Sequence, residues 1–92
     1  MTDERIQKWI DIFAALASDA RLEIARMLAQ GKTECQEILA RLDLSQPAIS
    51  YHLRKMEHAG ILIKEKKGSR NCYRLAERIQ DLIRMIDKEE ER

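Results

Sequence analysis

The segment Leu44–Met56 constrains the fold of this chain more than any other part of the sequence. The Ser45 hydroxyl can accept a hydrogen bond from an unpaired amide in a first helical turn, and Pro47 falls where a helix needs no intrahelical donor. Apolar residues then recur at i, i+4 and i+7, namely Ile49, Leu53 and Met56. Gly60 can adopt the positive φ that ends many helices. The sequence therefore predicts an amphipathic helix between Ser45 and Gly60.

The opposite face of this predicted helix is polar and almost free of acidic side chains. It carries Ser50, Tyr51, Arg54, Lys55 and His58. Only Glu57 interrupts the segment, whereas the other predicted helices mix both charges. A helix that contacts phosphate excludes carboxylates, so this face favours a polyanionic partner. A surface helix kept soluble by its charges is the alternative.

After Gly60 the pattern changes from helical spacing to strand alternation. Ile61–Ile63 is apolar, Lys66–Ser69 has the composition of a turn around Gly68, and Asn71–Leu75 alternates again. These features predict a β-hairpin over about residues 61–75. Its tip carries Lys66, Lys67 and Arg70. Lysines often protect the exposed edge of a hairpin, but a basic tip directly after the predicted helix favours contact with a polyanion.

The distribution of charge supports this interpretation better than the total does. The whole chain has a formal net charge of only +1. Residues 45–75 contain seven lysines and arginines and two glutamates, a net charge of +5, which leaves −4 for the remainder. Positive charge is thus concentrated in the segment whose predicted fold suits DNA.

The rest of the chain predicts helices packed into one domain over residues 1–92, too short a length for two domains. Ser18 is an N-cap for a second helix, and Thr33 with Gln36 forms a capping box for a third. The predicted fold is mainly α with one hairpin, in the order α-α-α-α-β-β-α, with terminal helices at about 3–17 and 76–90. No apolar run suggests a membrane span or a signal peptide, so we expect a cytoplasmic protein.

The two terminal helices carry more apolar surface than a domain of this size readily buries. We expect this surface to form the interface of a homodimer, although it could instead complete the core of the subunit. The residues assigned to the interface are Ile6, Trp9, Ile10, Phe13, Ile79, Leu82, Ile83 and Ile86.

Several segments together resemble the ArsR/SmtB-type winged helix-turn-helix repressors. Leu16–Leu22 is similar to the start of the family's second helix, with Asp19 where a proline is common. Leu44–Leu53 resembles the family's recognition helix, and Ala59–Leu75 resembles its wing. The order and spacing of these motifs cover nearly the whole chain. The helix-turn-helix is expected at about residues 33–59.

The resemblance implies a homodimeric, sequence-specific repressor that binds an inverted-repeat operator in double-stranded DNA. The residues expected to contact DNA are Ser45, Gln46, Pro47, Ser50, Tyr51, His52, Arg54, Lys55, Lys66, Lys67, Ser69 and Arg70. Gln46 and Ser50 are expected to read base edges. The sequence shows no phosphate loop or paired nucleophile and base, so neither an enzyme nor a cofactor is expected. A winged helix that binds another protein is the alternative.

The cysteines depart from the metal-sensing members of the family. Cys35 stands alone where those members carry a cysteine pair, and residues 76–92 contain neither histidine nor cysteine. We therefore expect no family-type metal site within one subunit. Cys35 and Cys72 are expected to be packing residues. A thiol switch is the alternative, since in winged-helix folds the residues before the third helix often lie beside the returning wing strand. The sequence does not identify an effector.

Overall fold

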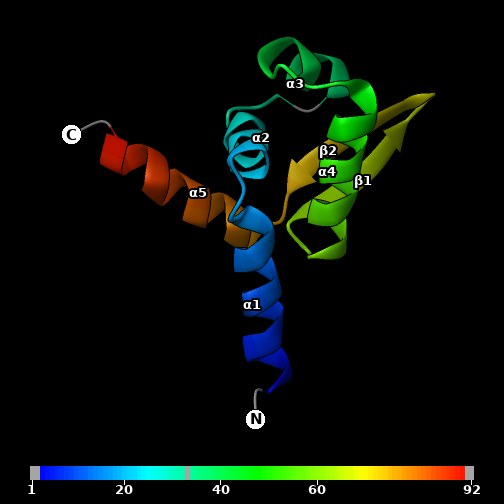
Figure 1. The fold of residues 1–92 in the computed structure, drawn as a ribbon. Coiled ribbons are helices and arrows are strands. Elements are labelled where there is room, and N and C mark those ends of the chain that lie inside the picture. Colours follow the sequence, from blue (N-terminus) through cyan, green and yellow to red (C-terminus); the bar gives the residue numbers. More distant parts are fainter. Residues whose placement is uncertain (1–2, 33, 91–92) are drawn as a thin grey trace.

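The computed structural model describes residues 3–32 and 34–90, and these residues form helices around one hairpin (Figure 1). The elements run in the order α1 (Glu4–Leu16), α2 (Asp19–Ala29), α3 (Cys35–Arg41), α4 (Gln46–His58), β1 (Leu62–Lys67), β2 (Arg70–Leu75) and α5 (Glu77–Glu90). The predicted fold class and order of elements are confirmed. The predicted boundaries of the terminal helices differ from the observed ones by about one residue.

Side-chain caps explain where three of the helices begin. The side chains of Asp3, Ser18 and Ser45 accept hydrogen bonds from amides in the first turns of α1, α2 and α4. Each cap satisfies an amide that has no partner within its helix. In α3 the N-cap is Glu34, without a side-chain cap bond. The predicted capping box involves Thr33, which lies outside the described residues.

One hydrophobic core joins all the elements. The predicted stripe of α4 is fully buried, because Ile49, Leu53 and Met56 are each at most 1% exposed. The other fully buried large side chains come from α2, α3, α5 and the segment before β1: Ile24, Met27, Ile38, Ile61, Ile79 and Ile83. This packing holds α4 with its polar face toward solvent.

The hairpin is short and regular. β1 and β2 pair antiparallel from Leu62 opposite Leu75 to Lys67 opposite Arg70, so only Gly68 and Ser69 connect the strands. Gly68 has a φ of 65°, which suits such a tight connection. At the base of the hairpin, the Ala76 amide donates to the Ile61 carbonyl at 2.9 Å. The hairpin therefore starts from a fixed base and ends in an exposed basic tip.

The two terminal helices extend away from the body of the subunit (Figure 1). On α1, Ile6, Ile10 and Phe13 are each about half exposed. On α5, Met85 is 65% and Ile86 is 36% exposed. The structure alters the predicted interface in one respect: Ile79 and Ile83 are completely buried within the subunit, so neither is available to a second copy.

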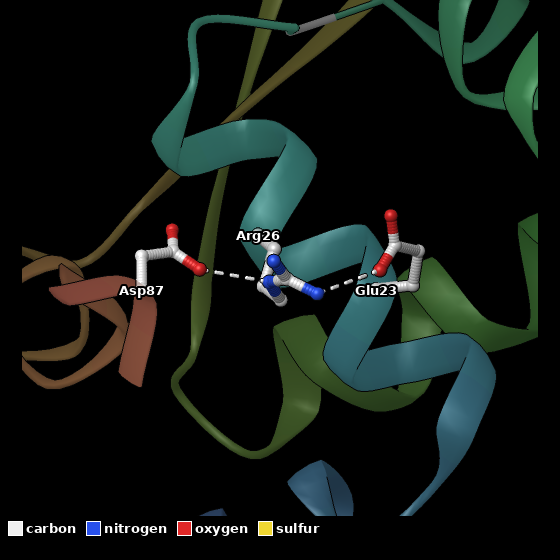
Figure 2. Close-up of polar contacts among 3 residues, drawn as sticks. All are labelled: Glu23, Arg26 and Asp87. Carbon is white, nitrogen blue, oxygen red and sulfur yellow. Dashed lines mark hydrogen bonds and ion pairs between the residues drawn. The ribbon is translucent and has the colours of Figure 1, made fainter. Parts of the chain in front are cut away.

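An arginine links α5 to α2 (Figure 2). The Arg26 Nε donates a hydrogen bond to Asp87 Oδ1 at 2.8 Å, and its guanidinium also contacts Glu23 Oε2 at 3.4 Å. All three side chains are roughly one quarter to one third exposed. Because Asp87 lies in the distal part of α5, this contact fixes the direction in which α5 leaves the core.

Truncation of a core residue should test this packing. We expect Ile24→Ala to lower the free energy of unfolding by about 2–5 kcal/mol, because Ile24 is completely buried and its truncation leaves a cavity. The matched control is Ile63→Ala, at a side chain that is 38% exposed, with an expected loss of about 0.5 kcal/mol or less. Urea unfolding at one fixed protein concentration measures both values. Equal losses would contradict the assigned core.

Candidate nucleic-acid interface

The solvent-facing side of α4 presents most of the residues predicted to contact DNA. Gln46, Pro47, Tyr51, Arg54 and Lys55 are exposed, whereas Ser50 is half-buried. The first turn of α4 contains no acidic residue. The N-terminal end of this helix therefore combines the positive end of the helix dipole with uncharged polar side chains, a combination suited to base edges and phosphates.

The hairpin tip supplies a second basic region. Lys66 and Lys67 are exposed, and neither makes an ion pair with another residue in the described part of the chain. Arg70, in contrast, donates a hydrogen bond to Glu34 Oε1 at 2.9 Å. Glu34 also forms a β-bridge with Cys72. Arg70 thus ties the hairpin to the start of α3, a role that the sequence did not reveal.

The imidazole of His52 contacts Arg21 near the junction of α1 and α2, so it is not free to read bases. The Arg21 guanidinium lies 3.2 Å from His52 Nδ1, and Arg21 Nε donates to the Ala15 carbonyl at 2.6 Å. Burial, together with the Arg21 cation, lowers the pKa of His52. Since arginine can only donate, Nδ1 accepts the hydrogen bond and the imidazole is neutral. Arg21 therefore positions α4, and sequence analysis missed it because its partner lies on another helix.

The two cysteines lie near each other in the fold, because Glu34, the residue before Cys35, forms a β-bridge with Cys72 on β2. Successive strand residues point to opposite faces, so Cys72 and Tyr73 point apart. Cys35 packs against the hydrophobic core, and both cysteines are free thiols. Burial raises the pKa of the Cys35 thiol, and nearby Lys64 opposes this shift. The burial of Cys72 and the partial burial of Cys35 favour packing roles for both side chains.

Two further features bear on other classes of function. Among residues 3–32 and 34–90, no three histidine, cysteine or carboxylate side chains gather where they could hold a metal ion. None of the helices in that part of the chain is long and apolar enough to cross a membrane.

Comparison with known proteins places this arrangement in a family. Residues 18–64, just over half of the chain, match the family model described as "Bacterial regulatory protein, arsR family". These residues contain α2, α3, α4 and the start of β1, which form the helix-turn-helix and the base of the wing. The chain belongs to the arsR family. It is therefore a DNA-binding transcriptional regulator and not an enzyme, as the sequence motifs predicted.

Individual relatives agree with this assignment. An uncharacterized HTH-type transcriptional regulator of Methanocaldococcus jannaschii is 33% identical over 92% of this chain and 98% of its own length. The biofilm growth-associated repressor of Agrobacterium fabrum is 39% identical over 72% of this chain, which spans 56% of that protein. The homodimeric winged helix-turn-helix domain Mb0332 of Mycobacterium bovis superimposes with a TM-score of 0.85 at 22% identity, covering 99% of this chain and 88% of that one. The last likeness establishes the winged helix-turn-helix fold.

The contact between Arg21 and His52 predicts a pH dependence of stability. The pKa of His52 is lower in the folded protein than its ordinary value of 6.5, so the unfolded chain takes up this proton first as the pH falls. The stability contributed by neutral His52 should be complete above pH 6.5 and decrease as the pH falls through 6.5 toward the folded pKa. Urea unfolding between pH 7.5 and 5.5 measures this decrease. The loss of stability over this pH range should be smaller in the His52→Gln variant. An equal loss in the variant and the wild-type protein would contradict the assignment of this pH dependence to His52.

Proposed function

We propose that this arsR-family protein is a homodimeric repressor that binds an inverted-repeat operator through α4 and the β1–β2 wing. The observation that carries the proposal is the acid-free exposed face of α4 beside a basic wing. α4 packs along β1, and the short connection between them makes the wing tip return toward the N-terminal end of α4 (Figure 1). Both basic regions can then contact one DNA duplex.

The residues of this surface divide into two kinds of contact. Gln46 and Ser50 are proposed to address base edges, because they lie in the first turns of α4 and a glutamine amide can pair with adenine. The exposed lysines of the wing tip, Lys66 and Lys67, are proposed to contact phosphates, together with Ser69 and Arg70. Tyr51, Arg54 and Lys55 are proposed to contact bases or phosphates further along α4. Phosphate contacts add affinity for any sequence, whereas base contacts add specificity.

A pair of variants separates these two kinds of contact. Gln46→Ala should reduce the preference at one position of each half-site, at a cost of about 1–3 kcal/mol for the preferred base. Lys66→Ala should weaken binding to all sequences alike and decrease the dependence of log K on log salt by about 1. Fluorescence anisotropy with a selected operator, its single-base variants and random duplex DNA measures both effects.

The same titrations test the proposed function as a whole. A uniform loss in both variants would contradict base reading by Gln46. Failure of the wild-type protein to bind any duplex in a salt-dependent way would contradict the proposed function, and would favour a winged helix that binds another protein.

The proposed dimer uses the exposed apolar faces of α1 and α5. Ile6, Ile10 and Phe13 follow one another at i, i+4 and i+7, and together they form a stripe along the projecting part of α1. Trp9 and Leu82 are half-buried at the margins of these faces. A two-fold axis through such faces buries them and can place both α4 helices on one side of the dimer. The M. bovis domain with this fold is described as homodimeric.

An acidic substitution on this stripe tests the dimer. Ile10 is 47% exposed in the subunit, so Ile10→Glu should leave the fold intact but bury a charge at the two-fold interface. We expect sedimentation to show a monomer with unchanged helical circular dichroism. Ile63→Glu, at an exposed apolar residue of the wing, is the control and should stay dimeric. A wild-type protein that sediments as a monomer at micromolar concentration would contradict the dimer.

A further inference from the structure

A groove of about 490 Å³ separates α1 from the C-terminal half of α4. One wall belongs to α1, the other belongs to α4, and Arg21 of α2 lies between them. The residues that line the groove are Asp11, Ala14, Ala15, Arg21, Tyr51, Arg54, Lys55, His58 and Ala59. Three of these are alanines, two in α1 and one at the C-cap of α4, so the groove is open to a bulky group that approaches from solvent.

The charges in the groove favour an anionic occupant. Within the described residues, Arg54 and Lys55 make no ion pair, although the Lys55 ammonium lies 5.7 Å from the centre of the Tyr51 ring. Arg21 adds a third cation at the junction with α2. Asp11 is the only acidic lining residue, and its carboxylate accepts a hydrogen bond from the Gln7 side chain at 3.1 Å. The groove therefore keeps an excess of positive charge.

The position of the groove indicates which anion it receives. Tyr51, Lys55 and His58 are spaced i, i+4 and i+7, so they continue the exposed face of α4 away from its N-terminal end. This face spans about 10 Å along the helix axis, at 1.5 Å per residue. A long, open, basic surface of this kind suits a nucleic-acid strand better than a small molecule, which is usually enclosed by its site.

The groove wall and the proposed dimer stripe occupy different faces of α1. Asp11, Ala14 and Ala15 are spaced i, i+3 and i+4 and face α4, whereas the exposed apolar stripe includes Ile10 and Phe13. α1 can therefore contact a second copy and border the groove at the same time. This places a helix outside the helix-turn-helix next to the DNA-binding surface.

We propose that the groove between α1 and α4 receives the DNA phosphate backbone further along α4 than its base-reading end, and that Asp11 limits the affinity of this contact. The inference rests on the proposed function, since it assumes that α4 binds DNA. Arg54 and Lys55 then pair with phosphate, and Ala14 and Ala59 leave space for the backbone. Asp11 repels the same phosphates, so the wild-type protein binds DNA less tightly than its cations alone would permit.

Removal of the Asp11 charge gives the most direct test. Asp11→Asn keeps an oxygen for the Gln7 hydrogen bond and should tighten binding to any duplex by roughly three- to tenfold at low salt, with a smaller gain at high salt. The control Asp81→Asn makes the same change of charge on exposed α5, and we expect less than a twofold effect. Equal effects of the two variants would show only a change of net charge and would overturn the proposal.

A second variant tests whether Asp11 acts through the groove. Arg54→Gln should decrease the dependence of log K on log salt by about 1, and Asp11→Asn should gain less in this background, because both changes act on the same phosphates. Strictly additive effects would overturn the proposal. The proposal would also be overturned if Asp11→Asn left the DNA affinity unchanged while NMR showed saturable binding of inorganic phosphate in the groove. Wild-type protein without any duplex binding would instead refute the proposed function itself.

Discussion

Burial of one side of α4 is the constraint on which the rest of the structure depends. Ile49, Leu53 and Met56 are almost completely inaccessible to solvent, and each contributes about 1.5–3 kcal/mol by leaving water. A helix that is anchored in the core by three residues along one stripe cannot rotate about its axis. The polar residues between these anchors must then face outward, and the wing that follows Gly60 must pack beside the helix. The proposed DNA-binding surface is therefore a consequence of core packing.

Two polar contacts then adjust the position of this surface. Arg21 joins the end of α1 to α4 through His52, and Arg70 joins the wing to the start of α3 through Glu34. The second pair is largely exposed on the arginine side, so it contributes little to stability. Its effect is to orient the hairpin. Lys66 and Lys67, at the exposed tip of this hairpin, make no ion pair within the described residues.

The sequence predicted those parts of the fold that local signals determine. Ser45 and Gly60 mark the limits of α4, and the glycine in Lys67–Arg70 marks the hairpin connection, because caps and turns depend on neighbouring residues. The Arg21–His52 contact joins residues 31 positions apart, and no local pattern encodes such a pairing. Ile79 and Ile83 were likewise assigned to a dimer, since helical spacing identifies an apolar face but not its partner.

The three separate faces of α1 have a consequence for the engineering of paired subunits. One face enters the core through Ile12 and Leu16, a second carries Ile10 and Phe13, and a third borders the groove through Asp11. In the proposed homodimer, substitutions on the second face would change which subunits associate without altering the other two faces. Complementary charges placed there would give obligate heterodimers. Two subunits with different α4 residues would then recognise an asymmetric operator with unlike half-sites.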